Sequence, residues 1–477
     1  MDEVALWDAK SQLHAYQGKN VFDVQIAEFL LSDGRFVPTQ EKLFTKYKVD
    51  TLDALAVAQR AELSKKPSLA TLFDEIEMKL VPVLWRMEAR GIRLDVVRLK
   101  KLAEEIDSEI KRLNTEILDQ VGFEINLNSP TQIGNYLVEK EGVPLEKTRT
   151  GKYATGEQEL TKHSNQFPII QKILSYRGLA KLRSTYIDSL ISKVDENGRI
   201  HTTYSQVAAN TGRLASLNPN LQNIPVTSEY GQKIKSCFES DTGYQFVSFD
   251  YSQQELRILA HLTGEAKLID AFNNSLDVHK TTASQLFNTP YDAVTKDQRA
   301  VGKTINFGII YGMSSFGMSA GLNIPVEEAQ KFIDTFYATY PKIRTYYDQY
   351  LKNAKIDGFA ETMLGRRRYV FEYPGKKFID NSMKRVLMNY PIQGSAADLM
   401  KKAMILLDAQ VLTKYADVHM LLQIHDDLVF EIKDRSDDEF LEIINEIKNT
   451  MCTVHPLAVP VEVDIKVGTR WGEMQPL

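Results

Sequence analysis

The 477-residue chain has few cysteines and no long apolar run. Its two cysteines, Cys237 and Cys452, lie far apart, which excludes a disulfide framework or a CxxC metal site and favours a reducing, cytoplasmic compartment. No uninterrupted apolar stretch approaches the roughly 20 residues of a membrane-spanning helix. The first residues, MDEVALWDAK, carry acids where a signal or transit peptide would carry Lys or Arg. These absences predict a protein that has no membrane partner.

The chain also lacks an excess of positive charge. Lys and Arg number 58 against 63 Asp and Glu, a net charge of −5, which argues weakly against nucleic acid as a partner. Two stretches oppose this average: residues 171–183 hold four basic residues and no acid, and residues 366–385 hold seven basic residues and two acids. Each stretch fits either a solvated basic face or a track for phosphates, so charge alone leaves the partner open.

The apolar spacing predicts a mixed α/β protein with several domain-sized units. After a predicted cap at Asp95, apolar residues recur every three or four positions to residue 117, which indicates an amphipathic helix. Helical spacing is also found at 168–193 and, with Gly and Pro interruptions, from 292 to about 352. No internal repeat or low-complexity tract is visible.

Two short apolar runs end at carboxylates. Residues 244–249, YQFVSF, predict a strand that ends at Asp250, and residues 420–432, MLLQIHDDLVFEI, predict two strands joined by a tight turn. Paired carboxylates suit Mg²⁺, and two such ions about 3.5–4 Å apart can hold both oxygens of a phosphoryl transfer. If the strands pair, Asp250 and Asp426 can share a site. The alternative is that each aspartate caps a turn or a helix.

A third pattern lies between these runs. In residues 298–312, QRAVGKTINFGIIYG, two cations and then two aromatics recur every four positions and share one broad side of a predicted helix. They are Arg299, Lys303, Phe307 and Tyr311. Such a stripe can bind a triphosphate and stack against a base. The alternative, with the aromatics in the core and the cations in solvent, is compatible with the same spacing.

In order along the chain, these segments resemble the motifs of the family A DNA polymerases, which include bacterial DNA polymerase I. The similar segments are DYSQQELRILAHLTGE from Asp250, RAVGKTINFGIIYG from Arg299 and QIHDDLVFE from Gln423. TGRLASLNPNLQNIP from Thr211 and RVLMNYPIQGSAADLMKKA from Arg385 resemble the primer-template contact segments, and SPTQIGNYL and YRGLAKLRSTYID resemble the thumb. The resemblance runs from about residue 70 to the C-terminus.

The resemblance implies a right-hand polymerase fold with palm, fingers and thumb. The expected divisions are a vestigial, truncated 3′→5′ exonuclease-like domain at 1–70, palm at 71–97, 191–268 and 383–477, thumb at 98–190, and fingers at 269–382. The expected partners are primer-template DNA and dNTPs, bound by a monomer in a bacterial-type cytoplasm in association with the nucleoid.

The same resemblance implies a DNA-templated DNA polymerase that extends a primer 3′-OH with dNTPs by two-metal nucleotidyl transfer. Asp250 and Asp426 are expected to hold two Mg²⁺ ions, for which Mn²⁺ can substitute, with the Tyr251 carbonyl as a further ligand. The metals would lower the pKa of the primer hydroxyl and neutralise charge on the triphosphate. Lys303 is expected to take part in catalysis. The expected nucleotide-binding residues are Arg299, Lys303, Phe307, Tyr311, His279, Glu255 and Gln253.

Glu255 is expected to act as a steric gate that occupies the space of a ribose 2′-OH. The competing interpretation is a helix-surface salt bridge to Arg257 or a nearby Lys. The expected DNA contacts are Arg213, Gln222, Asn223, Arg385, Asn389, Gln393 and His425, with Arg177, Lys181 and Arg183 on the thumb. The minor-groove contacts among them would read acceptors common to all base pairs.

The chain departs from the family pattern at several places. Asp427, expected to support the site, stands where the family usually has Glu, Gln254 replaces a usual Ile, and Thr227 replaces a common Arg. The N-terminal stretch WDAKSQLHAYQGKNVFDVQIAEFLLSDG resembles the middle of a proofreading exonuclease, with Asp8 at one metal-ligand position. Its DxE and YxxxD motifs are missing, so we predict no 3′→5′ exonuclease activity.

Three other functions use similar residues. A single-subunit RNA polymerase of the same fold could share both aspartates, but Glu255 argues against it. A catalytically inactive primer-template binding protein would keep the basic surfaces and lose the acids. A two-metal nuclease would have no need of the triphosphate stripe.

Overall fold

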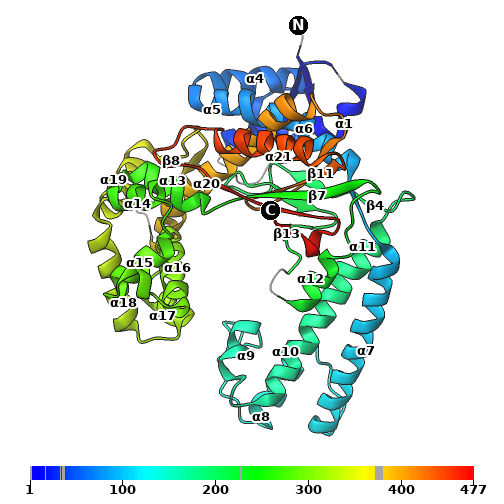
Figure 1. The fold of residues 1–477 in the computed structure, drawn as a ribbon, viewed down its shortest axis with the longest axis vertical. Coiled ribbons are helices and arrows are strands. Elements are labelled where there is room, and N and C mark those ends of the chain that lie inside the picture. The colour runs from blue at the N-terminus through cyan, green and yellow to red at the C-terminus, as the bar shows by residue number, and fades with distance from the viewer. Residues whose placement is uncertain (1–2, 17, 33, 35–37, 226–227, 371–379) are drawn as a thin grey trace.

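The computed structural model describes residues 3–16, 18–32, 34, 38–225, 228–370 and 380–477. A sheet lies near the centre, and two groups of helices extend from it in the same general direction (Figure 1). Helices of the N-terminal and C-terminal segments lie on the opposite side of the sheet. The predicted mixture of helices and strands is confirmed. None of the helices in these ranges is long and apolar enough to cross a membrane.

The central sheet has five strands in the order β10-β11-β7-β12-β13. Their bounds are Val418–Ile424 (β10), Asp427–Lys433 (β11), Tyr244–Tyr251 (β7), Val463–Gly468 (β12) and Gln475–Pro476 (β13). Neighbouring strands are antiparallel throughout. Both faces of β7 are covered, because Val247 and Phe249 join the largest hydrophobic cluster while Phe246 joins a second one on the other side. This explains why the adjacent residues Phe246 and Val247, which point to opposite faces, are both apolar.

The N-terminal segment forms a small unit with its own hydrophobic cluster. Its elements are β1 (Val4–Leu6), α1 (Ala9–Gln12), η1 (Leu13–Ala15), β2 (Val21–Asp23), α2 (Val24–Leu31), α3 (Gln40–Tyr47), α4 (Leu52–Ser64) and α5 (Pro67–Leu72). β1 and β2 are parallel. The carboxylate of Asp8 accepts a hydrogen bond from Ser11 N (3.3 Å) at the start of α1, so this predicted exonuclease residue serves here as a helix cap.

The first group of helices, cyan to green in Figure 1, contains α7 (Val96–Val121), α8 (Pro130–Glu139), α9 (Glu157–His163), α10 (Pro168–Lys181), η3 (Leu182–Ile187) and α11 (Asp188–Lys193). We call it the first arm. The predicted cap is confirmed, because Asp95 Oδ1 accepts a hydrogen bond from Arg98 N (2.9 Å). The predicted helical stretch at 168–193 is one continuous helical path in which η3 is a π-helical turn.

The second group, green to yellow in Figure 1, contains α14 (Ala266–Asn273), α15 (Val278–Leu286), η4 (Tyr291–Ala293), α16 (Lys296–Ile310), α17 (Ser315–Leu322), α18 (Val326–Thr339) and α19 (Pro341–Asp357). We call it the second arm, and it confirms the helical pattern predicted from residue 292. The remaining elements are η2 (Phe73–Glu77), α6 (Met78–Arg90), β3 (Ile92–Arg93), β4 (Arg199–Ile200), β5 (Thr203–Ser205), β6 (Ala215–Leu217), α12 (Glu229–Lys235), α13 (Gln254–Thr263), β8 (Phe359–Glu361), β9 (Arg367–Tyr369), α20 (Asn381–Leu407), η5 (Asp408–Leu412), α21 (Asp437–Cys452) and η6 (Trp471–Glu473).

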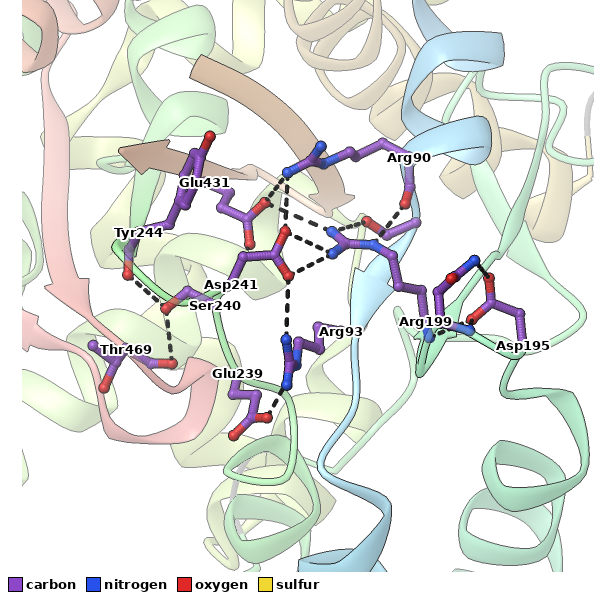
Figure 2. A network of polar contacts seen from close by, with 12 residues as sticks. Arg90, Arg93, Asp195, Arg199, Glu239, Ser240, Asp241, Tyr244, Glu431 and Thr469 are labelled. Carbon is purple, nitrogen blue, oxygen red and sulfur yellow. Dashed lines mark hydrogen bonds and ion pairs between the residues drawn. The ribbon is translucent and has the colours of Figure 1, made fainter. Parts of the chain in front are cut away.

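Ion pairs hold the root of the first arm against the sheet (Figure 2). The chain enters the arm through β3 and leaves it through β4, and these two strands pair. Glu431 on β11 is fully buried, and its carboxylate accepts hydrogen bonds from Arg90 Nη2 (2.8 Å) and Asp241 N (2.9 Å). Arg199 Nη1 reaches both oxygens of Asp241 (2.8 and 2.9 Å). The pairs thus join the chain before the arm, the chain after it and the central sheet.

A second set of buried charges ties the N-terminal half of the chain to α20. Glu77 accepts hydrogen bonds from Arg366 Nη2 and from Lys401 Nζ (2.6 Å), and Arg366 Nε also donates to Asp398 (2.8 Å). All four side chains are at most 3% exposed. Burial alone would raise the pKa of Glu77, but the two cations outweigh it and lower the pKa to about 2.

We predict that Glu77→Gln lowers the free energy of unfolding by about 3–5 kcal/mol, because it leaves Arg366 and Lys401 buried with one anion between them. The shift of the urea midpoint measures this change. Glu75→Gln is the matched control: Glu75 makes an exposed pair with Lys79, which is worth at most about 1 kcal/mol. Equal effects of the two substitutions would contradict the prediction.

Candidate active site

The register of β7 places three aspartates side by side. Asp250 pairs with Asp427 on β11 and with Asp464 on β12. Cross-strand partners at one position point to the same face of a sheet, so their carboxylates form a row at this edge. Asp464 was missed by sequence reasoning: the alternation in VEVDIKVG indicates a strand, but not which strand it pairs with.

Asp426 joins this row from the turn between β10 and β11. Its carbonyl oxygen accepts a hydrogen bond from Tyr251 N (3.0 Å), so the turn closes onto the residue after Asp250. His425, the residue before it, has a left-handed backbone with a φ of 56°, which reverses the direction of the chain between β10 and β11. The expectation that Asp250 and Asp426 come together is therefore confirmed. Neither carboxylate caps a helix in the described ranges, whereas Asp426 lies in the turn between β10 and β11, so only the helix-cap part of the alternative is wrong.

The acids perturb one another. The pKa of Asp250 is raised to about 7. The largest cause is the loss of solvation by the protein around the carboxylate, even though part of the residue is exposed, and the negative charges of Asp427, Asp426 and Asp464 add to it. Burial likewise raises the pKa of Asp427 to about 6, against the opposing effects of Ser248, Lys235 and Lys466. Burial also raises the pKa of Asp426, while Arg213 and His425 oppose it. A cation would relieve this repulsion.

The donor set fits a hard divalent cation only in part. Carboxylate oxygens are the ligands that Mg²⁺ prefers. Yet the described residues contain no group of three or more His, Cys, Asp or Glu side chains placed to hold a metal. Two carboxylates would therefore need further oxygens from the Tyr251 carbonyl, from water and from substrate phosphates, which is the usual way in which Mg²⁺ is bound beside nucleotides.

Glu255 lies close to the acids and is held at both carboxylate oxygens. It is 4% exposed, with Oε1 2.7 Å from Arg213 Nη2 and Oε2 3.0 Å from the Tyr311 hydroxyl, which donates to it. Burial raises the pKa of Glu255, while Arg213 and Tyr311 oppose the shift. The alternative of a surface salt bridge to Arg257 is wrong, because Arg257 is buried and pairs with Glu462 (2.5 Å).

The residues before Glu255 turn sharply into α13. Gln253 has a left-handed backbone, with φ at 53°, and is the cap position of the helix. The side-chain oxygens of Gln253 and Gln254 are both buried without a hydrogen-bond partner. The amide of Gln254 is thus shielded from solvent where the family usually places an apolar Ile.

The cationic and aromatic stripe lies on the outer side of α16, as expected. Arg299 and Lys303 are exposed, while Ile305 and Ile309 on the other side of the helix are buried. The Phe307 and Tyr311 rings stack with their centroids 6.3 Å apart and their planes at 23°. Tyr311 is 39% exposed, so the alternative that places the aromatics in the core is wrong.

His279 approaches the stripe from α15. It is 3% exposed, its ring lies 5.6 Å from that of Phe307, and Asn306 Nδ2 is 3.0 Å from its Nδ1. Burial lowers its pKa to about 4, so the ring is neutral at pH 7. When Nδ1 accepts from Asn306, Nε2 carries the proton. A phosphate would therefore meet an N–H donor here, not an additional positive charge.

The expected DNA contacts fall into two groups. Asn223, Arg385 and His425 are exposed. The other four have partners within the protein: Arg213 binds Glu255, Gln222 Nε2 donates to Gln423 Oε1 (3.0 Å), and Asn389 Nδ2 donates to Gln393 Oε1 (3.3 Å). Thr227, the departure from a common Arg, lies outside the described residues.

Two of the three expected thumb cations have structural partners instead. Arg177 donates to the carbonyl oxygens of Leu127 and Thr155 (both 2.9 Å), and burial lowers its pKa. Arg183 pairs with Asp107 (2.9 Å) and with Asp188. Lys181 is exposed and has no partner in the described part of the chain. A basic stretch does not reveal such contacts, because most of these partners lie on segments that are distant in sequence.

The fold is that of a polymerase domain. The POL domain of Pol1 from M. smegmatis, solved in complex with DNA primer-template and dNTP, matches 98% of this chain and 86% of its own with a TM-score of 0.89 and 34% identity. The mixed α/β right-hand fold expected from the sequence is thereby confirmed. The bounds of palm, fingers and thumb remain predictions.

The chain belongs to DNA polymerase family A, whose family model matches residues 96–473. It is 43% identical to the thermostable DNA polymerase I of Thermus aquaticus, over 86% of this chain and 49% of that protein. It is 41% identical to DNA polymerase I of Pseudomonas aeruginosa, over 86% of this chain and 45% of that protein. The chain thus spans about half the length of the curated relatives that it matches.

We predict that the thermal midpoint of Asp250→Asn rises relative to the wild type between about pH 5 and 7 in EDTA. A folded-state pKa raised above the unfolded value of 3.8 means that the wild type loses stability as pH rises through this window, and Asn removes that loss. Scanning calorimetry at each pH measures the difference in thermal midpoint between Asp250→Asn and the wild type. Mg²⁺ should reduce this difference, because a bound cation offsets the repulsion between the carboxylates of the wild type. Asp292→Asn, at an exposed aspartate, is the control; a pH-independent difference for Asp250→Asn would refute the assignment.

Proposed function

We propose that the protein is a DNA-templated DNA polymerase that extends a primer with dNTPs and releases pyrophosphate. One observation carries the proposal. The hydrogen bond from Tyr311 to Glu255 brings the triphosphate-binding stripe of α16 to the carboxylates of β7 and the β10–β11 turn. A nuclease or a simple DNA-binding protein would have no use for both features in one place.

Asp250 and Asp426 would hold two Mg²⁺ ions, together with the Tyr251 carbonyl. When bound, these ions neutralise charge on the triphosphate and lower the pKa of the primer 3′-OH. The carboxylates themselves remain ionised under these conditions, because a cation offsets the mutual repulsion that raises their pKa values. Asp427, whose raised pKa is opposed by a hydrogen bond with Ser248 and by the charges of Lys235 and Lys466, would support the row of acids without needing to ligate.

The protein's own groups would bind and orient the nucleotide. Arg299 and Lys303 bind the triphosphate, and the neutral His279 offers one N–H donor. The 3′-oxygen of the primer then forms a bond to the α-phosphorus as the bond to pyrophosphate breaks. Phe307 lies beside the sugar and Tyr311 beside the nascent base pair.

Glu255 selects deoxynucleotides. Because both of its carboxylate oxygens are held, by Arg213 and Tyr311, the side chain cannot rotate away to admit a 2′-hydroxyl without breaking a hydrogen bond. Polar atoms left unpaired in this way are the strongest source of discrimination that a binding site offers. This argues against the single-subunit RNA polymerase, which has to accept that hydroxyl.

The arms and the sheet would together hold the primer-template. We assign the first arm to a thumb at 98–190, the second to fingers at 269–382, and the sheet to a palm. Asn223, Arg385 and His425 are the exposed candidates for DNA contact, and Lys181 is the candidate on the thumb. Binding through phosphates would make the affinity fall with salt.

Primer extension on a labelled hairpin tests the proposal. Extension with dNTPs and Mg²⁺, none with EDTA, and little with rNTPs are expected. A lane without dNTPs reports any shortening of the primer. A primer of unchanged length would agree with the predicted lack of 3′→5′ exonuclease activity. If the protein binds DNA but does not extend the primer with dNTPs and Mg²⁺, the catalytically inactive binding protein is the better description.

Asp426→Ala should abolish extension while the affinity for primer-template stays equal to or tighter than that of the wild type, because the substitution removes an acid from a surface that faces phosphates. Single-turnover extension and fluorescence anisotropy measure the two quantities. Asp438→Ala, at an exposed position in the first turn of α21, should change neither. Extension by Asp426→Ala at the wild-type rate would overturn the metal assignment.

Phe307→Tyr should make dideoxynucleotides better substrates relative to dNTPs, because the added hydroxyl beside the sugar can replace the interaction that the missing 3′-OH would make. Competition between a ddNTP and its dNTP on a sequencing gel gives the ratio. Phe316→Tyr, on the exposed side of α17, is the matched control. An unchanged ratio would show that Phe307 lies away from the sugar.

A further inference from the structure

Asp277, just before α15, lies beside the proposed triphosphate stripe and was not among the expected site residues. Its Oδ1 accepts a hydrogen bond from Lys280 N (3.0 Å) and so caps α15. Its Oδ2 accepts one from Arg299 Nε (2.5 Å), and its backbone N–H donates to the Tyr291 hydroxyl (3.0 Å). The backbone and both carboxylate oxygens are thus fixed before any ligand arrives.

The contact uses only one edge of the Arg299 guanidinium. Nε faces Asp277, whereas neither Nη atom has a hydrogen-bond partner among the described residues, and the side chain remains 44% exposed. The two Nη groups form the fork that binds phosphate oxygens in pairs. An aspartate on Nε therefore fixes the plane of the guanidinium and leaves this fork free.

Close packing of α15 on α16 keeps the geometry in place. At Gly302 on α16, a Cβ would lie 2.4 Å from the His279 carbonyl oxygen, so only glycine permits this approach. His279 follows Asp277 by two residues and contacts Asn306 of α16. Lys303 lies one turn beyond Arg299 on the exposed side. The start of α15 thus brings Asp277 and His279 to the same part of the stripe.

Two other roles for the contact between Asp277 and Arg299 fit its geometry less well. A carboxylate that imitated a phosphate and competed with it would be expected on the Nη fork, but Asp277 is on Nε. An ordinary surface ion pair stabilises a protein only slightly, largely because ordering two flexible side chains offsets the attraction. Here the helix cap has already ordered the carboxylate, so the attraction is available to orient Arg299.

We propose that Asp277 is a positioning residue for the triphosphate of the incoming nucleotide, which holds Arg299 so that its Nη fork faces the phosphates. The inference rests on the proposed polymerase function. Asp277 does not touch the substrate itself. Its contribution is to reduce the conformational freedom that Arg299 would otherwise lose on binding.

Asp277→Asn tests the proposal, because Asn caps helices as well as Asp does but binds a guanidinium more weakly. The KM for dNTP should rise about fivefold, the order expected from losing one such bond, while kcat changes less than about twofold. Asp297→Asn removes an equivalent charge in the first turn of α16, from an exposed residue, and should leave both constants unchanged. Thermal midpoints of both variants should match that of the wild type.

A double-mutant cycle separates orientation of Arg299 from other effects. In an Arg299→Lys background, which lacks Nε, Asp277→Asn should raise KM no further. A KM that falls in Asp277→Asn would show competition, an unchanged KM would show a surface pair only, and a rise that persists in the Lys background would show an effect through α15. Each of these three results overturns the proposal. If Asp277→Asn proves unstable, Asp277→Ser, which also caps, replaces it.

The proposed function is tested separately by the wild type. Without primer extension by the wild type, the polymerase assignment fails. Binding of dATP to the protein with a dideoxy-terminated hairpin still measures the role of Asp277, since no chemistry follows. With extension by the wild type but wild-type dNTP affinity in Asp277→Asn, only the positioning role fails.

Discussion

The structure of the site depends on hydrogen-bond register in one sheet. β7 pairs with β11 and β12 so that Asp250 stands between Asp427 and Asp464, and the turn before β11 adds Asp426. A slip of one residue would turn Asp250 to the other face of the sheet and disperse the row. The register is secured by apolar residues on both faces, since Val247 and Phe246 enter different clusters. The core thus stabilises a cluster of like charges that would repel one another if they were alone.

Glu255 connects this electrostatic centre to the helices around it. Through Arg213 it contacts the segment that follows β5, and through Tyr311 it contacts the end of α16. A buried carboxylate with two fixed partners needs both of them, because either oxygen left alone would lose solvation without compensation. The proposed selection of deoxynucleotides and the position of the second arm therefore depend on the same side chain.

Sequence reasoning found most of the regular structure and the principal acids. The apolar run before Asp250, the cap at Asp95 and the four-residue spacing of α16 are local signals, and local signals survive in a single sequence. Asp464 and Asp277 were missed because their importance comes from strand pairing and helix packing between distant segments. The same limitation applies to Arg177: the basic stretch around it was visible, but the carbonyl oxygens to which it donates belong to loops 22 and 50 residues away.

The ion pairs at the root of the first arm have a mechanical consequence. Glu431 and Asp427 are four residues apart on β11, so the strand holds them roughly 13 Å apart. The base of the first arm and the row of aspartates at the edge of the sheet therefore keep a fixed distance from each other. Any swing of the arm has to occur farther out, and the π-helical turn at Leu182–Ile187 offers a natural bending point, because such turns interrupt the regular helical ladder. The distal helices can then move while the row of aspartates at the edge of the sheet keeps its position.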